Sequence, residues 1–311
     1  MKVDIIIPTY KPGKKFIRLL KMLHKQTVKV NKFIVINTNE KYFIKLTQEN
    51  DFLEQYKDVV IRHISEYEFD HGGTRKMAVS MSDADYFVCM TDDAVPMDKY
   101  LLENLLEPLV EEKAAISYAR QCVGKKSSDI ERFSRKFNYP SKSFYKSKED
   151  LSKMGIKTFF CSNVCAAYDR KVYDSLGGFV KHTIFNEDMI FAAAAVEAGY
   201  SIYYSSEAKV RHSHSYNNLQ QFKRNFDLGV SQAKFPEVFD KVSSTGEGKK
   251  LVKETASYLR KKGKGKRIID LYITSAFKYA GYLLGKNYKR IPRKLRLKCT
   301  MNKMYWLKDD H

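Results

Sequence analysis

The stretch ADYFVCMTDD, residues 84–93, carries an apolar run that ends in two adjacent aspartates. Such a run, closed by polar residues, is typical of a strand buried on both faces of a sheet. Two carboxylates at the end of a buried strand are unfavourable unless a positive charge compensates them. A hard divalent cation, Mg²⁺ or Mn²⁺, prefers carboxylate oxygens and is the usual compensation. Asp92 and Asp93 therefore indicate a metal site that also holds substrate phosphates, although Asp93 or Asp98 could instead cap the following helix.

Strand and helix patterns alternate on both sides of this stretch. Further strand patterns are VDIIIPTY (3–10), NKFIVINTN (31–39) and VVIRHIS (59–65), and helical spacing is found at 14–26, 42–56, 74–81 and 101–110. This alternation predicts an α/β fold with a mostly parallel, Rossmann-like sheet covered by helices on both faces. Ligands of such sheets bind at the carboxyl ends of the strands. We therefore expect the chemistry just after Pro8, Asn37, Ser65 and Asp93.

A second acidic pair, Glu187 and Asp188, lies in the segment FNEDMIFAAAAVEAGY, residues 185–200. The pair opens a helix whose apolar side would dock on the sheet. Carboxylates in a first turn are favoured by the helix dipole, which gives a purely structural interpretation. One of them could equally act as a general base toward a sugar hydroxyl. The segment alone leaves both interpretations open.

Two histidines, His212 and His214, alternate in the segment VRHSHSY, residues 210–216, after a predicted strand. Alternate residues of an extended chain point to the same side, so both imidazoles can face one site. A neutral imidazole is a common ligand of a divalent ion, and a structural role is the alternative.

The segment FDHGGTRKMA, residues 69–78, resembles a phosphate-binding turn only loosely. Gly72 and Gly73 would allow a close backbone approach, and a helix start at Thr74 would offer free N–H groups to an anion. Arg75 can pair with a phosphate. An ordinary turn from a loop into a helix is the alternative.

The C-terminal region is strongly basic, and it makes a large contribution to the net charge of +20. Residues 249–311 contain 19 lysines and arginines against 4 aspartates and glutamates. After a predicted linker at 246–250, an amphipathic helix follows Lys266. Its apolar side is expected to carry Ile269, Tyr272, Ile273, Ala276, Ala280 and Leu283, with Asp270, Thr274 and Lys278 opposite.

This basic, amphipathic end predicts an anionic membrane surface as a partner. Nucleic acid is the competing partner, but the sequence has no zinc-finger, helix-turn-helix or RNA-recognition signature. No apolar stretch is long enough to span a membrane, and the five cysteines match no disulfide framework. We therefore expect a cytoplasmic protein on the inner face of the cell membrane. The predicted domains are a catalytic unit at 1–245, with halves of about 1–120 and 121–245, and a helical region at 246–311. Residues 124–155 are expected to form a mobile excursion beside the site.

Taken together, these segments resemble the inverting family 2 glycosyltransferases of the GT-A fold. The resemblance covers residues 1 to about 230 and carries, in order, VDIIIPTY, NTN, TDDAVP, GGF, NEDMIF and VRHSH. FDHGGTRKMA, TDDAVP and the later NFDLGV (225–230) look more particularly like the rhamnosyltransferase branch.

The resemblance implies a role for each matching residue. The nucleotide sugar would lie beside Pro8, Thr9, Tyr10, Thr38, Arg75 and Asp92, with Arg75 facing its diphosphate. The family's metal, Mg²⁺ or Mn²⁺, would be held by Asp93 and by His212 or His214. The family's catalytic base matches Asp188.

Two positions depart from the family pattern. Thr91 replaces the first carboxylate of the metal motif, and Asn37 or Thr38 stands where an acidic residue commonly follows the second strand. Base recognition is therefore expected to differ, which is compatible with a thymidine nucleotide. The sequence thus predicts transfer of rhamnose from thymidine diphosphate rhamnose onto a lipid-linked glycan of the bacterial surface. The alternatives are a uridine diphosphate hexose as donor and, more distantly, a nucleotidyltransferase, for which PTYKPGKK (8–15) is a weak phosphate loop.

Overall fold

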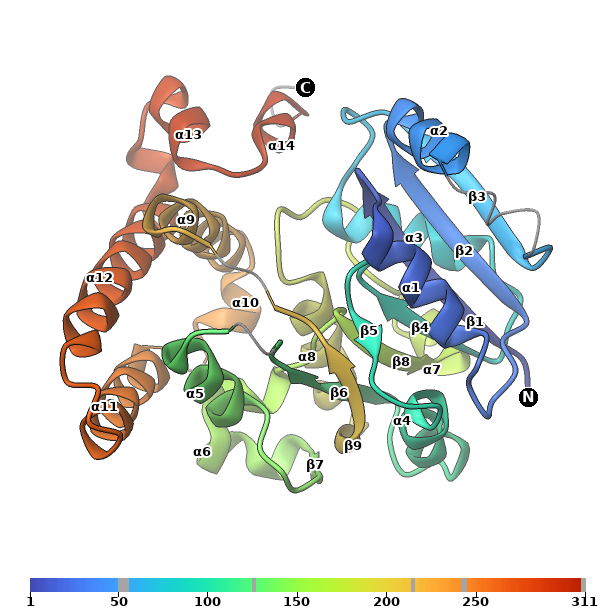
Figure 1. The fold of residues 1–311 in the computed structure, drawn as a ribbon, viewed down its shortest axis with the longest axis horizontal. Coiled ribbons are helices and arrows are strands. Elements are labelled where there is room, and N and C mark those ends of the chain that lie inside the picture. Colours follow the sequence, from blue (N-terminus) through green and yellow to red (C-terminus); the bar gives the residue numbers. More distant parts are fainter. Residues whose placement is uncertain (50–55, 125–126, 214–215, 242–244, 309–311) are drawn as a thin grey trace.

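The computed structural model describes residues 1–49, 56–124, 127–213, 216–241 and 245–308. Within them, nine strands form one sheet in the order β3-β2-β1-β4-β8-β6-β9-β5, and β7 pairs with β9 (Figure 1). The strands are β1 (Val3–Tyr10), β2 (Lys32–Thr38), β3 (Val59–Ile64), β4 (Tyr86–Met90), β5 (Val95–Pro96), β6 (Ile116–Cys122), β7 (Phe144–Lys146), β8 (Cys165–Asp169) and β9 (Ile202–Arg211). Strands β3, β2, β1 and β4 are mutually parallel, as are β6 and β9, whereas β8, β5 and β7 are antiparallel to their neighbours. The predicted α/β class with a mostly parallel sheet is confirmed.

Helices cover both faces of the sheet, which explains why its strands are apolar at successive positions. The covering helices are α1 (Lys14–Leu23), α2 (Glu40–Glu49), α3 (His71–Ser80), α4 (Leu101–Val110), α7 (Arg170–Ser175) and α8 (Glu187–Glu197). In β1, Ile5 and Ile7 pack in one core with α1, α2 and α4, whereas Ile6 packs in the other with α3, α7 and α8. Asp169 caps α7 as its position in the sequence indicates, because its side chain accepts a hydrogen bond from the N–H of Val172 at 2.9 Å.

Residues 124–155, expected to form a mobile excursion, contain regular secondary structure in their described part. The described part folds into α5 (Asp129–Asn138), β7, η2 (Lys148–Asp150) and α6 (Leu151–Met154), followed by η3 (Gly155–Phe159). Strand β7 is held by its pairing with β9. Lys146 of β7 is buried and donates to the carbonyl oxygens of Lys157 and Phe160. Long-range pairing therefore orders a segment that has few apolar anchors of its own.

The linker expected at 246–250 is also absent, because these residues lie inside α11 (Thr245–Lys261). Ala256 and Leu259 of this helix are buried in a small core with Leu271 and with the partly buried Ile130 of α5. That tertiary packing outweighs the low helix propensity of the two glycines at 246 and 248.

The C-terminal helices form a layer beside the sheet, at the left of Figure 1. They are α9 (Asn218–Lys234), α10 (Pro236–Phe239), α11, α12 (Arg267–Lys286), η4 (Tyr288–Arg290), α13 (Arg293–Cys299) and α14 (Lys303–Lys308). Helix α12 approaches α9 closely through two glycines. A Cβ added at Gly281 or Gly285 would lie 2.2 or 2.1 Å from the carbonyl oxygen of Phe222 or Phe226 respectively. Only glycine permits this backbone approach.

Helix α12 has two unlike faces. Leu271, Gly281 and Gly285 are buried, and Thr274 donates a hydrogen bond of 2.9 Å to Asn218 of α9. The residues expected on the apolar side are exposed, including Ile269, Tyr272, Ile273 and Leu283. The polar side, not the apolar side, therefore meets the protein. None of the helices in the described residues is long and apolar enough to cross a membrane.

The chain end returns to the sheet through α14, which reaches toward α3 (Figure 1). The ring of Tyr305 stacks on His182 at 4.5 Å, and Lys308 donates a hydrogen bond of 3.0 Å to the carbonyl of Phe69. Asp227 of α9 is buried and accepts a hydrogen bond of 2.6 Å from Thr300, which anchors the segment before α14. Burial raises the pKa of Asp227 to about 7.

Candidate active site

The pairing of β4 with β8 brings two acidic segments together at one edge of the sheet. Strand β4 ends at Met90, which pairs with Cys165 at the start of β8. Just beyond that pair, the N–H of Thr91 donates to the carbonyl of Val164 at 3.2 Å. Asn163 is the residue before Val164, and its N–H donates to the carboxylate of Asp188 at 2.9 Å. The segments with Asp92 and Asp188 are thus joined by two adjacent residues.

Asp92 and Asp93 form a charged pair at the end of β4. Burial, with the negative charge of Asp93, raises the pKa of Asp92 to about 7. The Oδ1 atom of Asp93 lies 3.4 Å from Nε2 of His212, and its Oδ2 atom lies 3.5 Å from Nζ of Lys15. The pair therefore has the unfavourable mutual repulsion that a bound cation relieves.

Gln121 of β6 fixes the orientation of His212, a role that its sequence context does not reveal. Its amide nitrogen donates to the hydroxyl of Tyr139 at 2.5 Å and to that of Ser162 at 3.0 Å. Its amide oxygen accepts from Arg135 and lies 3.1 Å from Nδ1 of His212. Since an amide oxygen can only accept, Nδ1 of His212 donates to Gln121, and Nε2 faces Asp93. A histidine oriented by such a second contact is typical of metal ligands.

The residues at this position fit a divalent cation, with carboxylate oxygen from Asp93 and imidazole nitrogen from His212. Among the described residues, no three or more His, Cys, Asp or Glu side chains gather as a metal-binding group. The second predicted histidine ligand, His214, lies outside the described residues.

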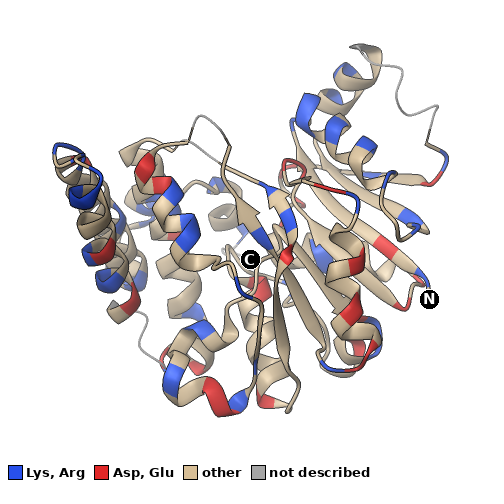
Figure 2. Cartoon of the chain, turned by 60° about the horizontal axis from the view of Figure 1, so that its bottom comes forward, with Lys and Arg blue, Asp and Glu red and all other residues tan. Residues whose placement is uncertain are grey.

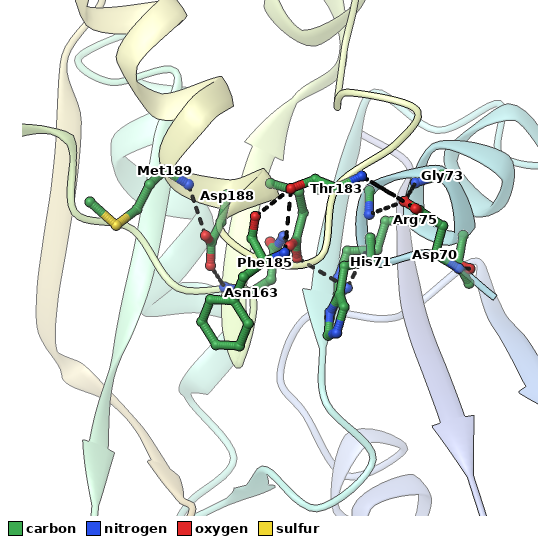
Figure 3. A network of polar contacts seen from close by, with 12 residues as sticks. Asp70, His71, Gly73, Arg75, Asn163, Thr183, Phe185, Asp188 and Met189 are labelled. Carbon is green, nitrogen blue, oxygen red and sulfur yellow. Dashed lines mark hydrogen bonds and ion pairs between the residues drawn. The ribbon is translucent and has the colours of Figure 1, made fainter. Parts of the chain in front are cut away.

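Glu187 and Asp188 are neighbours at the start of α8 but have different partners, and Figure 3 shows Asp188 beside Asn163 and Met189. Glu187 is buried, lies 3.0 Å from the guanidinium of Arg75 and accepts a hydrogen bond of 3.0 Å from the side chain of Asn163. Asp188 is half-buried and accepts from the N–H groups of Asn163 and Met189. Burial and the charge of Glu187 raise the pKa of Asp188. Asp188 thus combines access with a raised pKa, and both are properties of a general base.

The start of α3 does not offer free N–H groups to an anion. The helix begins at His71, and the Asp70 carboxylate accepts from the N–H groups of Gly72 and Gly73 at 3.0 and 2.9 Å. A Cβ at either glycine would lie within 2.6 Å of a backbone carbonyl oxygen of the segment 180–181. The glycines therefore allow close packing within the protein rather than close approach of a ligand, which corrects the expectation for this turn.

Arg75, expected near the donor diphosphate, has its charge engaged inside the protein. Its guanidinium is buried against Glu187, and it donates a hydrogen bond of 3.0 Å to the carbonyl of His71 (Figure 3). Its Nε atom is buried without a hydrogen-bond partner in the described part of the chain, and a contact of Arg75 with the diphosphate stays a prediction.

The residues predicted to line the nucleotide base lie at the ends of β1 and β2. Pro8 is half-buried, Thr9 and Thr38 are buried, and Tyr10 is exposed. The hydroxyl of Thr9 donates to Asn37 at 3.0 Å, which links the two strand ends.

A recess of about 500 Å³ opens next to these strand ends, where β2 and β3 finish. It is lined by Asn39, Glu40, His63, Ile64, Ser65, Glu66, Glu68 and, from α14, Met304. Glu66 accepts from Tyr10 and from Asn39 at 3.2 Å. Because ligands of such sheets bind at the carboxyl ends of the strands, the sequence predicts a site just after Ser65. No local pattern predicts that α14 contributes to it.

The fold, with one acidic pair after β4 and another at the start of α8, is that of a glycosyltransferase of the GT-A type. Residues 4–177 match the family described as Glycosyl transferase family 2. The chain belongs to this family.

Two relatives align along almost the whole chain. The O-antigen chain rhamnosyltransferase RfbN of Salmonella typhimurium is 38% identical over 98% of this chain and 96% of its own. The O-antigen chain rhamnosyltransferase WbaN of Salmonella anatum is 36% identical over 97% of this chain and 95% of its own.

Solved structures share the fold at lower identity. The mannosyltransferase PcManGT from Pyrobaculum calidifontis, in complex with GDP-Man and Mn²⁺, is 14% identical with a TM-score of 0.56, over 98% of this chain and 85% of its own. Residues 1–349 of TarS from S. aureus are 15% identical with a TM-score of 0.53, over 93% of this chain and 91% of that one.

Proposed function

We propose that this glycosyltransferase moves rhamnose from thymidine diphosphate rhamnose, with inversion, onto a lipid-linked glycan during synthesis of a bacterial cell-surface polysaccharide. The observation that carries the mechanism is the half-buried Asp188 carboxylate, joined through Asn163 and Val164 to the acidic end of β4. The sugar is supported by the two O-antigen rhamnosyltransferases that align along the whole chain.

Asp188 serves as the general base in this proposal. Its carboxylate takes the proton from an acceptor hydroxyl, whose oxygen then forms a bond to the anomeric carbon. The bond from that carbon to the diphosphate oxygen breaks, and its electron pair leaves with the thymidine diphosphate. One displacement from the opposite face inverts the anomeric centre. Because the burial of Asp188 raises its pKa, the carboxylate is a stronger base than an exposed aspartate.

Asp93 and His212 are the residues that would hold Mg²⁺ or Mn²⁺ in this proposal. Such an ion supplies positive charge that stabilises the leaving diphosphate. The support within this chain is the orientation of His212 by Gln121, which directs Nε2 toward Asp93. Asp92, at a pKa of about 7, would contact the donor and gain from the same positive charge.

The thymidine base would lie in the recess at the ends of β2 and β3, beside Tyr10 and Thr38. Asn39 lines this recess, and its amide can pair with a base that carries two carbonyls and one N–H group. A uridine base carries the same carbonyl and N–H groups. Thymidine and uridine donors therefore differ only in the methyl group of the thymine, in the ribose and in the transferred sugar.

We also propose that the protein sits as a peripheral protein on the cytoplasmic face of the cell membrane, with α12 as its contact. The support is the exposed apolar face of α12, with Ile269, Tyr272 and Ile273, in a region rich in lysine and arginine (Figure 2). Apolar burial and attraction to anionic lipid then act on one surface, at about 1 kcal/mol per basic residue near the leaflet.

A donor screen tests the proposed activity. Purified protein with Mg²⁺ or Mn²⁺ is offered thymidine, uridine and guanosine diphospho-sugars together with a lipid-linked glycan acceptor. We expect thymidine diphosphate rhamnose to be the best donor. A clear preference for a uridine diphosphate hexose would contradict the rhamnose assignment, and exclusive use of nucleoside triphosphates would contradict sugar transfer altogether.

A further inference from the structure

Three basic side chains from separate helices lie near residues of the active site or face the helix beside it. They are Arg135 of α5, Arg224 of α9 and Lys278 of α12. Arg135 and Lys278 are half-buried, and Arg224 is exposed. We call these three residues the cationic cluster.

Arg135 stands one side chain away from the proposed metal ligand. Its guanidinium donates to the amide oxygen of Gln121, and the same oxygen lies 3.1 Å from Nδ1 of His212. The guanidinium carbon also lies 5.8 Å from the ring centroid of Tyr139. Because the described contacts of Arg135 are with neutral groups, its positive charge is not balanced by a carboxylate there.

Arg224 stands next to the segment that carries the proposed base. Its guanidinium lies over the ring of Phe185 at 4.7 Å and 5.8 Å from the ring of Tyr216. Phe185 precedes Asp188 by three residues at the entry to α8. Within the described residues, Arg224 forms no ion pair with a carboxylate, and the aromatic rings hold its side chain in place.

Lys278 reaches the cluster from the polar face of α12. Thr274, one turn earlier, bonds to Asn218, and Gly281, one turn later, lies against Phe222, so Lys278 faces α9. Burial lowers the pKa of Lys278, and the positive charges of Arg224 and Arg135 lower it further. The three cations are therefore close enough to repel one another.

Two other lysines of the helical layer are paired with acids. Lys264 lies 2.6 Å from Asp129 of α5, and Lys286 lies 2.9 Å from Asp240. Like charges brought together without an acidic partner destabilise the fold unless an anion joins them. The positions of Arg135 beside the Gln121–His212 contact and of Arg224 over Phe185, with Lys278 near both charges, therefore indicate an anion-binding site.

We propose that Arg135, Arg224 and Lys278 form a binding site for a diphosphate group at the acceptor side of Asp188. This inference rests on the proposed function, which supplies a diphosphate from two sources, the lipid-linked acceptor and the nucleotide sugar. Arginine side chains suit phosphate oxygens because their N–H groups are fixed in a plane, and lysine adds a point charge. The same helix that would contact the membrane with its apolar face thus carries Lys278 on its inner face.

The first test measures binding of inorganic diphosphate by calorimetry, without any sugar donor or acceptor. Lys278→Gln and Arg224→Gln should each weaken binding about tenfold, which is the loss of one charge-assisted contact. Lys286→Gln is the matched control on the same helix and should leave binding unchanged. Unchanged binding in both cluster variants, with folded protein, would overturn the site. This readout does not depend on the sugar, so it separates failure of the site from failure of the proposed function.

The second test identifies the source of the diphosphate from Michaelis constants. One acceptor carries the glycan on a lipid diphosphate, and the other carries the same glycan as a simple alkyl glycoside. If the acceptor is the source, Lys278→Gln raises the KM for the first acceptor about tenfold and leaves the second unchanged. If the nucleotide sugar is the source, the KM for the donor rises with both acceptors. Equal behaviour of Lys278→Gln and Lys286→Gln in every arm would overturn the proposal.

Folding of the variants is checked by thermal unfolding. Lys278→Gln removes one of three mutually repelling charges, so its Tm should equal or exceed that of the parent. Lys278→Arg keeps the charge and should retain diphosphate binding within a few-fold. A Tm loss in Lys278→Gln together with unchanged diphosphate binding would mean that Lys278 only packs α12 on α9, and would contradict the site.

Discussion

Charged side chains have different surroundings at the edge of the sheet and in the layer formed by α9 and α12. At the edge, charged groups lie in a dense set of contacts, in which Asp70, Glu187 and Asp188 each accept from defined partners. In the helical layer, Arg224 and Lys278 are without a carboxylate partner in the described part of the chain, and the outer face of α12 is apolar and exposed. Preorganised contacts suit a chemical step, whereas unbalanced charge and exposed apolar surface suit binding. We therefore assign catalysis to the edge and acceptor binding to the helical layer.

At the edge of the sheet, we expect the largest loss of stability when the buried ion pair of Glu187 and Arg75 is broken. Glu187→Gln leaves the positive charge of Arg75 buried without its partner, so the free energy of unfolding should fall by about 3 kcal/mol. Chemical denaturation measures this loss. Glu197→Gln on the same helix removes only partly exposed ion pairs with Lys148 and Lys241, and should cost less than about 1 kcal/mol. Equal stability of both variants would mean that Glu187 is not a structural anchor.

A variant of Asp93, at the same edge, tests whether turnover depends on a metal ion. Asp93→Asn should lower kcat/KM by at least about 100-fold, because metal charge stabilisation is worth several kcal/mol. Turnover is measured with Mg²⁺, with Mn²⁺ and in excess chelator. Full turnover in chelator would contradict the metal role of Asp93.

Substitutions on the outer face of α12 test whether the helical layer binds a membrane. Replacing Ile273 and Leu283 together by glutamine removes exposed apolar surface, and should weaken binding to anionic vesicles by about tenfold or more, since each buried side chain is worth about 1.5–3 kcal/mol. Flotation of vesicles measures this loss. Leu219→Gln on α9 is an exposed control and should change little.

The same vesicle experiment examines the alternatives for this face. Binding should fall at high salt and be weak on neutral vesicles, because attraction to the anionic leaflet is screened. Salt-sensitive binding of DNA or RNA that competes with vesicles would favour a nucleic-acid partner. Absence of vesicle binding by the intact protein would contradict the membrane role.

The raised pKa of Asp188 predicts the acidic side of the pH profile. The base must be ionised, so transfer falls as pH decreases through its pKa, which burial and Glu187 place above that of an ordinary aspartate. The falling limb should therefore lie at a higher pH than about 3.9, the value of a free aspartate. A profile of kcat/KM on a pH-stable parent protein measures it. A limb at the ordinary aspartate value would contradict the buried base.

The sequence predicts the sheet well where local pattern determines structure. Strands β1, β2 and β4 are apolar at successive positions because helices cover both faces, and their ends mark the site at Asp93. It fails where distant segments meet. Gln121 orients His212 only because β6 and β9 are neighbours, and Asp70 occupies the N–H groups that a local pattern offers to an anion.

The helical layer shows the same limit in a stronger form. The periodicity of α12 predicts an apolar face, but not that this face stays exposed while Lys278 turns toward α9. Glycines of α12 determine that choice, because they allow a closer approach to α9 than any larger residue would. The glycines of α11 indicate a linker, because the sequence does not show the core formed by Leu259 and Ile130.

The most direct test of the division between chemistry and binding is the Asp188→Asn variant, assayed for transfer and for donor affinity on the same preparation. The account predicts that transfer falls by about 100- to 10,000-fold, as expected for loss of a general base, while the Kd for the nucleotide sugar stays within a few-fold. Retained transfer, or loss of donor binding in a folded variant, would contradict the assignment of Asp188 as the base.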